Sequence, residues 1–300
     1  MKKTVIHYKQ TKLAYAPDAL VECINLYSKK YRALLIADSN EYLKDDNIPI
    51  TDRSEINKCD LLHCHNRKLF YFPIADDKPK LIQYHSHPLL CDIDFWGFKC
   101  VVAQFQCLLP EYKSFHRVRN IINLDNHIYF PDGGYDAVRI GYSPTCTANA
   151  TGSVEDKGYT QTCEILNVIK NQFSIEIDII TGVSLEECIR RKNKCHILID
   201  ECVTNSYHRC SLEALALGKV AVCSLDDSIR FVITQVTGGN DMPIDNIYIN
   251  QLQSHLISLI KTPLHELIKR GKMNRLWMEQ YWNPKNIVHE FERLYDILCR

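Results

Sequence analysis

Apolar residues in the first 135 positions form short runs separated by polar stretches. Such runs are typical of strands that are covered on both faces of a parallel sheet. Apolar residues also recur with helical spacing at positions 20, 23, 24 and 27. The pattern predicts strands at residues 4–7, 33–37, 61–64, 80–84 and 100–103, and a helix at residues 18–29. Strands separated by helices or long connections predict a parallel α/β sheet.

The second half of the chain repeats this alternation. Ser184 with Glu187 three residues later is a capping-box pattern, which predicts a helix start. Gly218 comes directly after another helical segment, where a left-handed residue commonly ends a helix. The expected strands are residues 138–142, 175–180, 196–200 and 220–223, and the expected helices are residues 158–172, 184–192 and 207–217, with a helical tail from residue 250.

A turn signal separates the two halves at Pro131-Asp132-Gly133-Gly134. We therefore predict a first α/β domain at residues 1–135 and a second that begins at residue 136. Ligands of such sheets bind at the carboxyl ends of the strands, and two such domains create a cleft between them.

Composition narrows the range of functions. The 300-residue chain has 36 Lys and Arg against 36 Asp and Glu, so its zero formal charge argues against a general electrostatic grip on nucleic acid. Neither a signal peptide nor an apolar run long enough for a stable membrane span is visible, so we expect a cytoplasmic protein. The 14 scattered cysteines are expected to be reduced and buried, with a disulfide framework as the alternative.

The segment Ser211-Leu212-Glu213-Ala214-Leu215-Ala216-Leu217-Gly218-Lys219-Val220 carries the most chemistry. A helix N-terminus at the sheet edge attracts a diphosphate. An unpaired Glu213 carboxylate there can accept hydrogen bonds from both hydroxyls of a ribose, and the small residues Ala214 and Ala216 allow close packing on the sheet. The segment resembles the donor-site signature of retaining GT-B glycosyltransferases. The structural alternative is an ordinary Rossmann-like helix without a ligand.

Other segments follow in that family's order. Residues 138–145, which end at Thr145, are similar to the first strand and phosphate-facing loop of the donor domain, and Lys157-Gly158 to the lysine that neutralises the diphosphate. Residues 281–295 resemble the closing helix. The resemblance thus implies two Rossmann-like domains (GT-B) facing each other across a cleft, with a donor domain at residues 136–275 and a helix at 276–300 that crosses back to the first domain.

The family's chemistry is transfer of a sugar from a nucleoside diphosphate sugar to an acceptor hydroxyl, with retention of configuration and no further cofactor. The sequence does not identify the acceptor, which could be a glycan, a lipid-linked sugar, a protein or a modified nucleobase. Alternatives are a non-catalytic nucleotide-sugar-binding protein and a nucleotide-sugar epimerase. Asn205 stands where many family members have a glutamate near the donor sugar. The candidate donor-binding residues are Lys157, Thr145, Asn205, Ser206, Tyr207, His208, Ser211 and Glu213.

Histidines follow two predicted strands of the first domain. His85 and His87 come after residues 80–84, where they can contact the donor sugar or acceptor, or move a proton. The alternative is that they only bond the loop backbone. His63 and His65 end the strand before, but with Cys59 or with His85 and His87 their spacing matches no standard zinc pattern.

Asp92 and Asp94 match the Asp-x-Asp pattern that holds Mn²⁺ or Mg²⁺ in another glycosyltransferase fold. Paired carboxylates suit hard cations, but two aspartates at this spacing are common. We interpret them as loop residues and expect no metal requirement.

Overall fold

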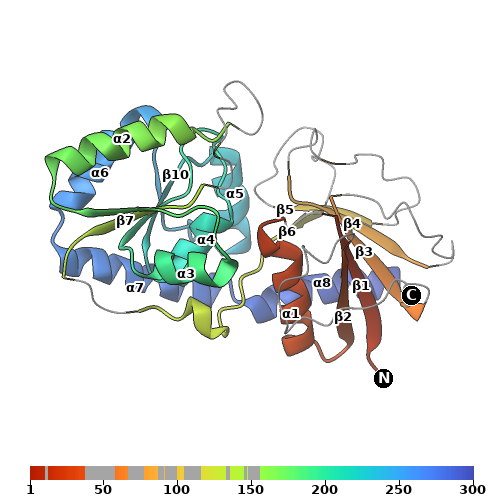
Figure 1. Ribbon diagram of the computed structural model, residues 1–300. Coiled ribbons are helices and arrows are strands. Elements are labelled where there is room, and N and C mark those ends of the chain that lie inside the picture. The colour runs from red at the N-terminus through yellow and green to blue at the C-terminus, as the bar shows by residue number, and fades with distance from the viewer. Residues whose placement is uncertain are drawn as a thin grey trace. The chain divides into compact units, whose positions relative to one another are not determined.

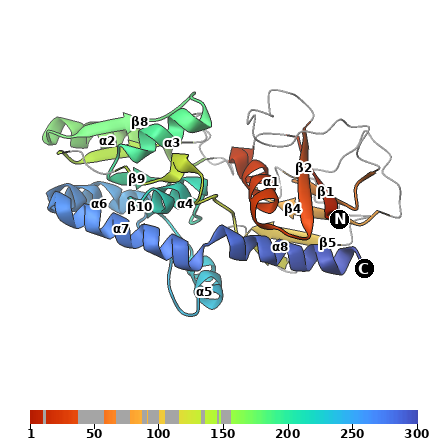
Figure 2. The same cartoon turned by 90° about the horizontal axis from the view of Figure 1, so that it is seen from below.

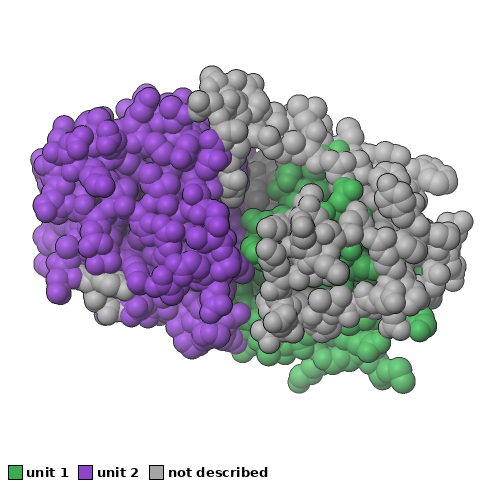
Figure 3. All heavy atoms as spheres, in the orientation of Figure 1, with its two compact units in different colours: residues 1–123, 283–300 green, residues 124–282 purple. Residues whose placement is uncertain are grey.

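The structure is a computed structural model that describes residues 1–10, 13–37, 58–66, 78–86, 91, 100–104, 116–132, 136–144, 147 and 156–300. Two compact units make up the chain (Figure 3). Unit 1 consists of Met1–Asn123 and Asn283–Arg300, and unit 2 of Leu124–Trp282. Within the described residues, none of the helices is both long and apolar enough to cross a membrane.

Unit 1 is built on a six-stranded parallel sheet with the order β2-β1-β3-β4-β5-β6. Each strand predicted from the sequence of this half is present, and β6 was not predicted. The strands are β1 (Lys3–Lys9), β2 (Tyr31–Ala37), β3 (Leu61–His65), β4 (Lys80–Tyr84), β5 (Cys100–Gln104) and β6 (His116–Val118).

Two helices from opposite ends of the chain pack together on unit 1, α1 (Ala16–Tyr27) and α8 (Pro284–Leu298) (Figure 2). The apolar side of α1 is buried through Leu20, Cys23 and Ile24. Phe291 and Tyr295 of α8 are also buried, and both rings lie against His63 of β3. Both helices therefore help to bury a sheet face that carries polar side chains.

Unit 2 has a five-stranded parallel sheet with the order β11-β10-β9-β7-β8. Its strands are β7 (Arg139–Tyr142), β8 (Glu176–Ile179), β9 (Ile197–Ile199), β10 (Val220–Cys223) and β11 (Ile244–Asn246). Its helices are α2 (Tyr159–Gln172), α3 (Leu185–Asn193), α4 (Arg209–Ala216), α5 (Asp227–Val236), α6 (Ile249–Lys261) and α7 (Leu264–Tyr281). Helices α2 and α6 pack together on one face of the sheet, and α4 and α7 pack together on the other (Figure 1).

The units divide at other residues than the predicted boundaries of 135 and 275. Residues 124–132 belong to unit 2 because the Arg275 guanidinium donates to the carbonyl oxygens of Leu124 and Tyr129, at 3.1 and 2.9 Å. The Asn193 side chain also donates to the carbonyl of Phe130, at 2.8 Å. At the other end, α7 continues without a break to Tyr281, which keeps residues 276–282 in unit 2.

Two predicted helix ends have the expected local geometry. The Ser184 hydroxyl accepts a hydrogen bond from the Glu187 amide at 3.3 Å, as an N-cap does. Gly218 has φ +66°, the left-handed conformation that ends α4. A Cβ on Gly271 of α7 would lie 1.9 Å from the Gly218 oxygen, so the absence of a side chain lets α7 pack directly on this turn. The eleven cysteines whose side chains the structure describes are free thiols.

Candidate functional site

Asp200 fixes the start of α4 at the carboxyl edge of the unit 2 sheet. It directly follows β9, and its Oδ2 accepts from the backbone amides of His208 and Ser211, at 2.7 and 3.2 Å. Burial works against its charge, but His208, Ser211 and Lys157 together hold the pKa of Asp200 below its ordinary value. The N-terminal end of α4 is therefore anchored by a carboxylate from the neighbouring strand.

Lys157 brings a positive charge to the same edge, and His208 brings ring nitrogens that can form hydrogen bonds. A Cβ on Gly158 would lie 2.6 Å from Cγ2 of Val203, so the loop before α2 touches the loop before α4. Lys157 is half-buried and close enough to influence the Asp200 carboxylate. The His208 ring is 24% exposed, with Nδ1 3.5 Å from Asp200 Oδ1. Such an arrangement beside a helix N-terminus suits an anion.

Asn205 and Ser206 lie in the loop between β9 and α4. Asn205 has φ +58°, a left-handed conformation that asparagine tolerates better than most residues. Its amide donates to the Ser224 hydroxyl at 3.0 Å, and its carbonyl accepts from the Asp226 amide at 2.8 Å. The backbone of Asn205 thus ties this loop to the end of β10, and Ser206 is half-buried beside it.

Two of the predicted donor-binding side chains point into the interior of unit 2. Tyr207 is fully buried, with its ring edge-on to Trp282 at a centroid separation of 6.4 Å. Ser211 is also buried, and its hydroxyl donates to Asp200 Oδ2 at 2.6 Å. In this structure both side chains therefore have structural partners in place of the expected position at the donor.

Glu213 is in the middle of α4 and is only 3% exposed. Its Oε2 lies 2.6 Å from the Lys192 ammonium, and its Oε1 lies 2.9 Å from Arg209 Nε. Burial alone would lower the pKa values of both cations, but neighbours that include Glu213 keep them above their ordinary values. The expectation of an unpaired carboxylate is wrong, while a contact between Glu213 and a ribose stays a prediction.

Unit 1 contains a chain of hydrogen-bonded histidines. His7 of β1 stands opposite His63 of β3, and His65 lies two residues further along the same face. His7 Nδ1 is 3.0 Å from His65 Nε2, and His65 Nδ1 is 2.8 Å from Nε2 of His85, which directly follows β4. His63 Nδ1 contacts the Tyr295 hydroxyl at 2.8 Å. The chain leads from the interior to the carboxyl edge of the sheet.

Burial keeps these imidazoles neutral. It lowers the pKa of His7 to about 3 and holds the pKa values of His63 and His65 well below 6.5. Because each neutral ring has one donor and one acceptor nitrogen, each hydrogen bond in the chain fixes the tautomer of the next ring. His85 at the half-buried end is thus oriented by His65. The predicted residues His87 and Thr145, and also Asp92 and Asp94, lie outside the described residues.

One nitrogen each from His7, His63 and His65 lies within 4.8 Å of the others, so these residues could hold a metal ion. A zinc ion needs a free lone pair from every ligand nitrogen. In the hydrogen bond between His7 and His65, one ring nitrogen instead carries a proton and the other uses its lone pair to accept it. This arrangement favours a chain of hydrogen bonds over a zinc site. His7 was not predicted from the sequence, because its partners His63 and His65 are 56 and 58 residues away along the chain. The signal that could have identified it is a polar residue within a predicted apolar strand.

No family model and no curated protein matches this sequence. The two parallel α/β units define a fold of the GT-B glycosyltransferase type, with two Rossmann-like domains. A glycosyltransferase from Rickettsia africae is similar at a TM-score of 0.66 and 14% identity, over 100% of this chain and 99% of that one. HepE from Anabaena, in complex with UDP and glucose, has a TM-score of 0.64 at 10% identity, over 99% and 100% of the two chains. At these identities the likeness shows the fold.

Proposed function

We propose that this chain transfers a glycosyl group from a nucleoside diphosphate sugar to an acceptor hydroxyl. The observation that carries the proposal is the placement of Lys157 and His208 beside the start of α4, at the carboxyl edge of the unit 2 sheet. Parallel α/β sheets bind nucleotides at this edge. The fold is shared with a structure described as a glycosyltransferase, and another similar structure holds UDP and glucose.

In this proposal, the chain's own side chains bind and stabilise the diphosphate. The Lys157 ammonium faces the phosphates and offsets the negative charge that grows on the departing diphosphate. His208 and the loop of Asn205 and Ser206 complete the donor site. Asp200 holds the start of α4 in place, so that the site needs little rearrangement when the donor binds. Catalysis then requires no metal, and retention of configuration follows from the family resemblance.

In unit 1, His85 is the residue that we propose contacts a substrate. His65 fixes its tautomer through the 2.8 Å hydrogen bond, so the His85 ring is already oriented before a substrate arrives. A neutral imidazole can donate a hydrogen bond to a sugar or phosphate oxygen, or accept a proton from an acceptor hydroxyl.

Donor binding is tested by a thermal-shift panel of UDP-, GDP-, ADP- and CMP-sugars on the purified chain. One nucleotide class should raise the melting temperature, and Lys157→Met should weaken binding of that donor by roughly ten- to a hundredfold. Lys170→Met, on the exposed side of α2, is the matched control and should bind like the wild type. The proposed donor site is wrong if Lys157→Met binds as tightly as the control.

Turnover separates the transferase from its alternatives. Release of nucleoside diphosphate that rises with an acceptor supports transfer, whereas binding without release indicates a non-catalytic protein. An epimerised donor would indicate an epimerase. Activity should persist in EDTA, and NMR of the product should show the anomeric configuration of the donor.

A further inference from the structure

A pocket of unit 2 lies at the edge of its sheet opposite the candidate donor site. It has a volume of about 440 Å³ and is lined by residues just before two strands, His196 before β9 and Lys219 before β10. Because the sheet is parallel, this is the amino edge, whereas the candidate donor site lies at the carboxyl edge. Its walls are largely apolar and include Leu217 from the end of α4 and Leu267 and Ile268 from α7.

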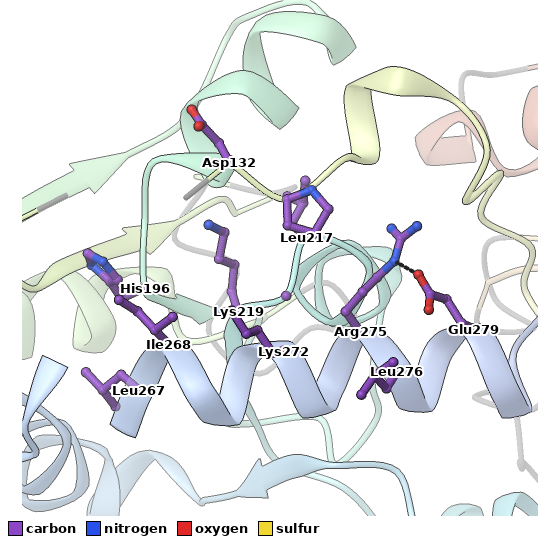
Figure 4. Close-up of a pocket in the computed structure, with 12 residues that line it drawn as sticks. Asp132, His196, Leu217, Lys219, Leu267, Ile268, Lys272, Arg275, Leu276 and Glu279 are labelled. Carbon is purple, nitrogen blue, oxygen red and sulfur yellow. Dashed lines mark hydrogen bonds and ion pairs between the residues drawn. The ribbon is translucent and has the colours of Figure 1, made fainter. Parts of the chain in front are cut away.

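Lys219 is the unusual residue of this pocket. The residue is only 7% exposed, yet its ammonium group has no hydrogen bond or ion pair among the described residues. Its backbone is fixed, since the amide donates to the Ala214 carbonyl at 2.8 Å and the carbonyl accepts from Asn274, also at 2.8 Å. Figure 4 shows the side chain extending from the turn toward Asp132, with His196 to one side.

The other charged groups around the pocket either form hydrogen bonds and ion pairs with neighbouring residues or lie exposed at the rim of the pocket. Arg275 donates to the carbonyl oxygens of Ala216, Tyr129 and Leu124 and pairs with Glu279 at 2.6 Å. Lys272 is exposed on α7. Burial, with the nearby cations Lys219 and Arg139, keeps the pKa of His196 below its ordinary value, so its ring is neutral. Lys219 is left as one positive charge inside a mostly apolar space.

A largely buried lysine without a hydrogen bond or ion pair for its ammonium group is costly, and an anion that enters the pocket would remove that cost. A single cation matches a single negative charge better than the two of a phosphate monoester, and Asp132 nearby reinforces this limit. Apolar walls favour a hydrocarbon body, because its burial is favourable by about 25 cal/mol for each Å² removed from water. We propose that this pocket binds a small amphipathic monocarboxylate whose carboxylate pairs with Lys219.

The test compares three eight-carbon probes that differ only in the head group, sodium octanoate, octan-1-ol and octylamine, in thermal-shift and calorimetric titrations of the whole chain. At about ten times its dissociation constant, octanoate should raise the melting temperature by about 2–4 °C. Octylamine should have no effect, and octan-1-ol should bind at least tenfold more weakly than octanoate.

Lys219→Met keeps most of the length of the side chain but removes its charge, and should abolish the preference for octanoate. Lys261→Met removes an exposed charge at the end of α6, away from the pocket lining, and should leave binding unchanged. Lys219→Gln gives a second variant if the methionine form fails to fold. Equal binding of octanoate and octan-1-ol, an octanoate response that survives in both Lys219 variants, or no binding at all would overturn the proposal. Nucleotide-sugar binding should be the same in Lys219→Met and the wild type, which keeps this test separate from the donor site.

Discussion

Two clusters of ionisable side chains lie inside this protein, and the cost of burying them is reduced in opposite ways. In unit 1, His7, His63 and His65 are buried as neutral rings that bond to one another and to Tyr295. In unit 2, Lys192 and Glu213 are buried with their charges, because the carboxylate lies between the Lys192 ammonium and the half-buried Arg209 guanidinium.

The difference follows from the cost of losing a charge. An imidazole has an ordinary pKa of about 6.5, so it becomes neutral at physiological pH with little cost. Lysine and arginine would have to shift their pKa values by several units, and it is more favourable for them to keep their charges beside a carboxylate. Lys219 is neither readily neutralised, as a histidine is, nor in an ion pair with a carboxylate among the described residues. Burial lowers its pKa to about 8. The comparison predicts distinct responses to substitution and to pH.

The largest effect is expected when the charged cluster loses its carboxylate. Glu213→Gln removes the carboxylate that pairs with the buried Lys192 ammonium and with half-buried Arg209, which should lower the free energy of unfolding by about 3–5 kcal/mol. Chemical denaturation measures this change. Glu187→Gln, which removes an exposed ion pair with Arg190, is the matched control and should cost less than about 1 kcal/mol.

The same variant tests the predicted ribose contact. A purely structural Glu213 would leave donor affinity near the wild-type value once the measurement is made well below the melting temperature. A fall of about ten- to a hundredfold in donor affinity would show that the carboxylate also binds the ribose. A variant as stable as the wild type would contradict the assignment of Glu213 to the buried ion cluster.

Removal of the Lys219 charge should increase the free energy of unfolding, whereas removal of the Glu213 charge should decrease it. The pKa of Lys219 is lowered from 10.5 to about 8, so the folded state binds its proton less tightly than the unfolded state. Lys219→Met should therefore raise the free energy of unfolding at pH 7, by about 2–3 kcal/mol. Denaturation of the variant without any added carboxylate is the measurement, and lower stability than the wild type would show that the ammonium has a partner.

The smallest expected effect is the loss of stability at low pH that is caused by a single buried histidine, His7. A histidine that stays neutral in the folded state binds fewer protons than the unfolded chain below pH 6.5, so stability falls as the pH falls from 6.5 toward the folded pKa, about 3 for His7. Between pH 7.5 and 5.5 each such histidine should cost about 1.4 kcal/mol. His7→Gln should remove that share of the loss, whereas His116→Gln at an exposed position should not. An unchanged pH dependence in His7→Gln would show that His7 is protonated in the folded state.

The sequence predicted most elements of the fold because their signals are local. Short apolar runs marked five of the six unit 1 strands, and Ser184 marked the start of α3. Helix α5 was missed, although Asp226 caps it and Ile229 and Ile233 recur at helical spacing. Strands β6 and β11 were missed because three-residue strands at sheet edges have almost no periodic pattern.

In the candidate site, too, the sequence predicted the local features and left the side-chain contacts undetermined. The motif around Glu213 and the lysine at position 157 indicated by themselves which helix and which loop would meet at the carboxyl edge of a parallel sheet. The orientation of each side chain was not available from the motif. Tyr207 and Ser211 are next to the predicted site in sequence, yet their side chains pack inside unit 2.

The sequence by itself determined the alternation of strands and helices, the helix ends at Ser184 and Gly218, and the position of the motif around Glu213, because each depends on residues within one or two helical turns. Tertiary structure decided which polar groups are paired. His7 meets His65 across 58 residues and Lys192 meets Glu213 across 21, through neighbouring strands in one case and a helix contact in the other. Burial then sets the charge of each group, and burial is a property of the packed sheet and helices rather than of any short segment.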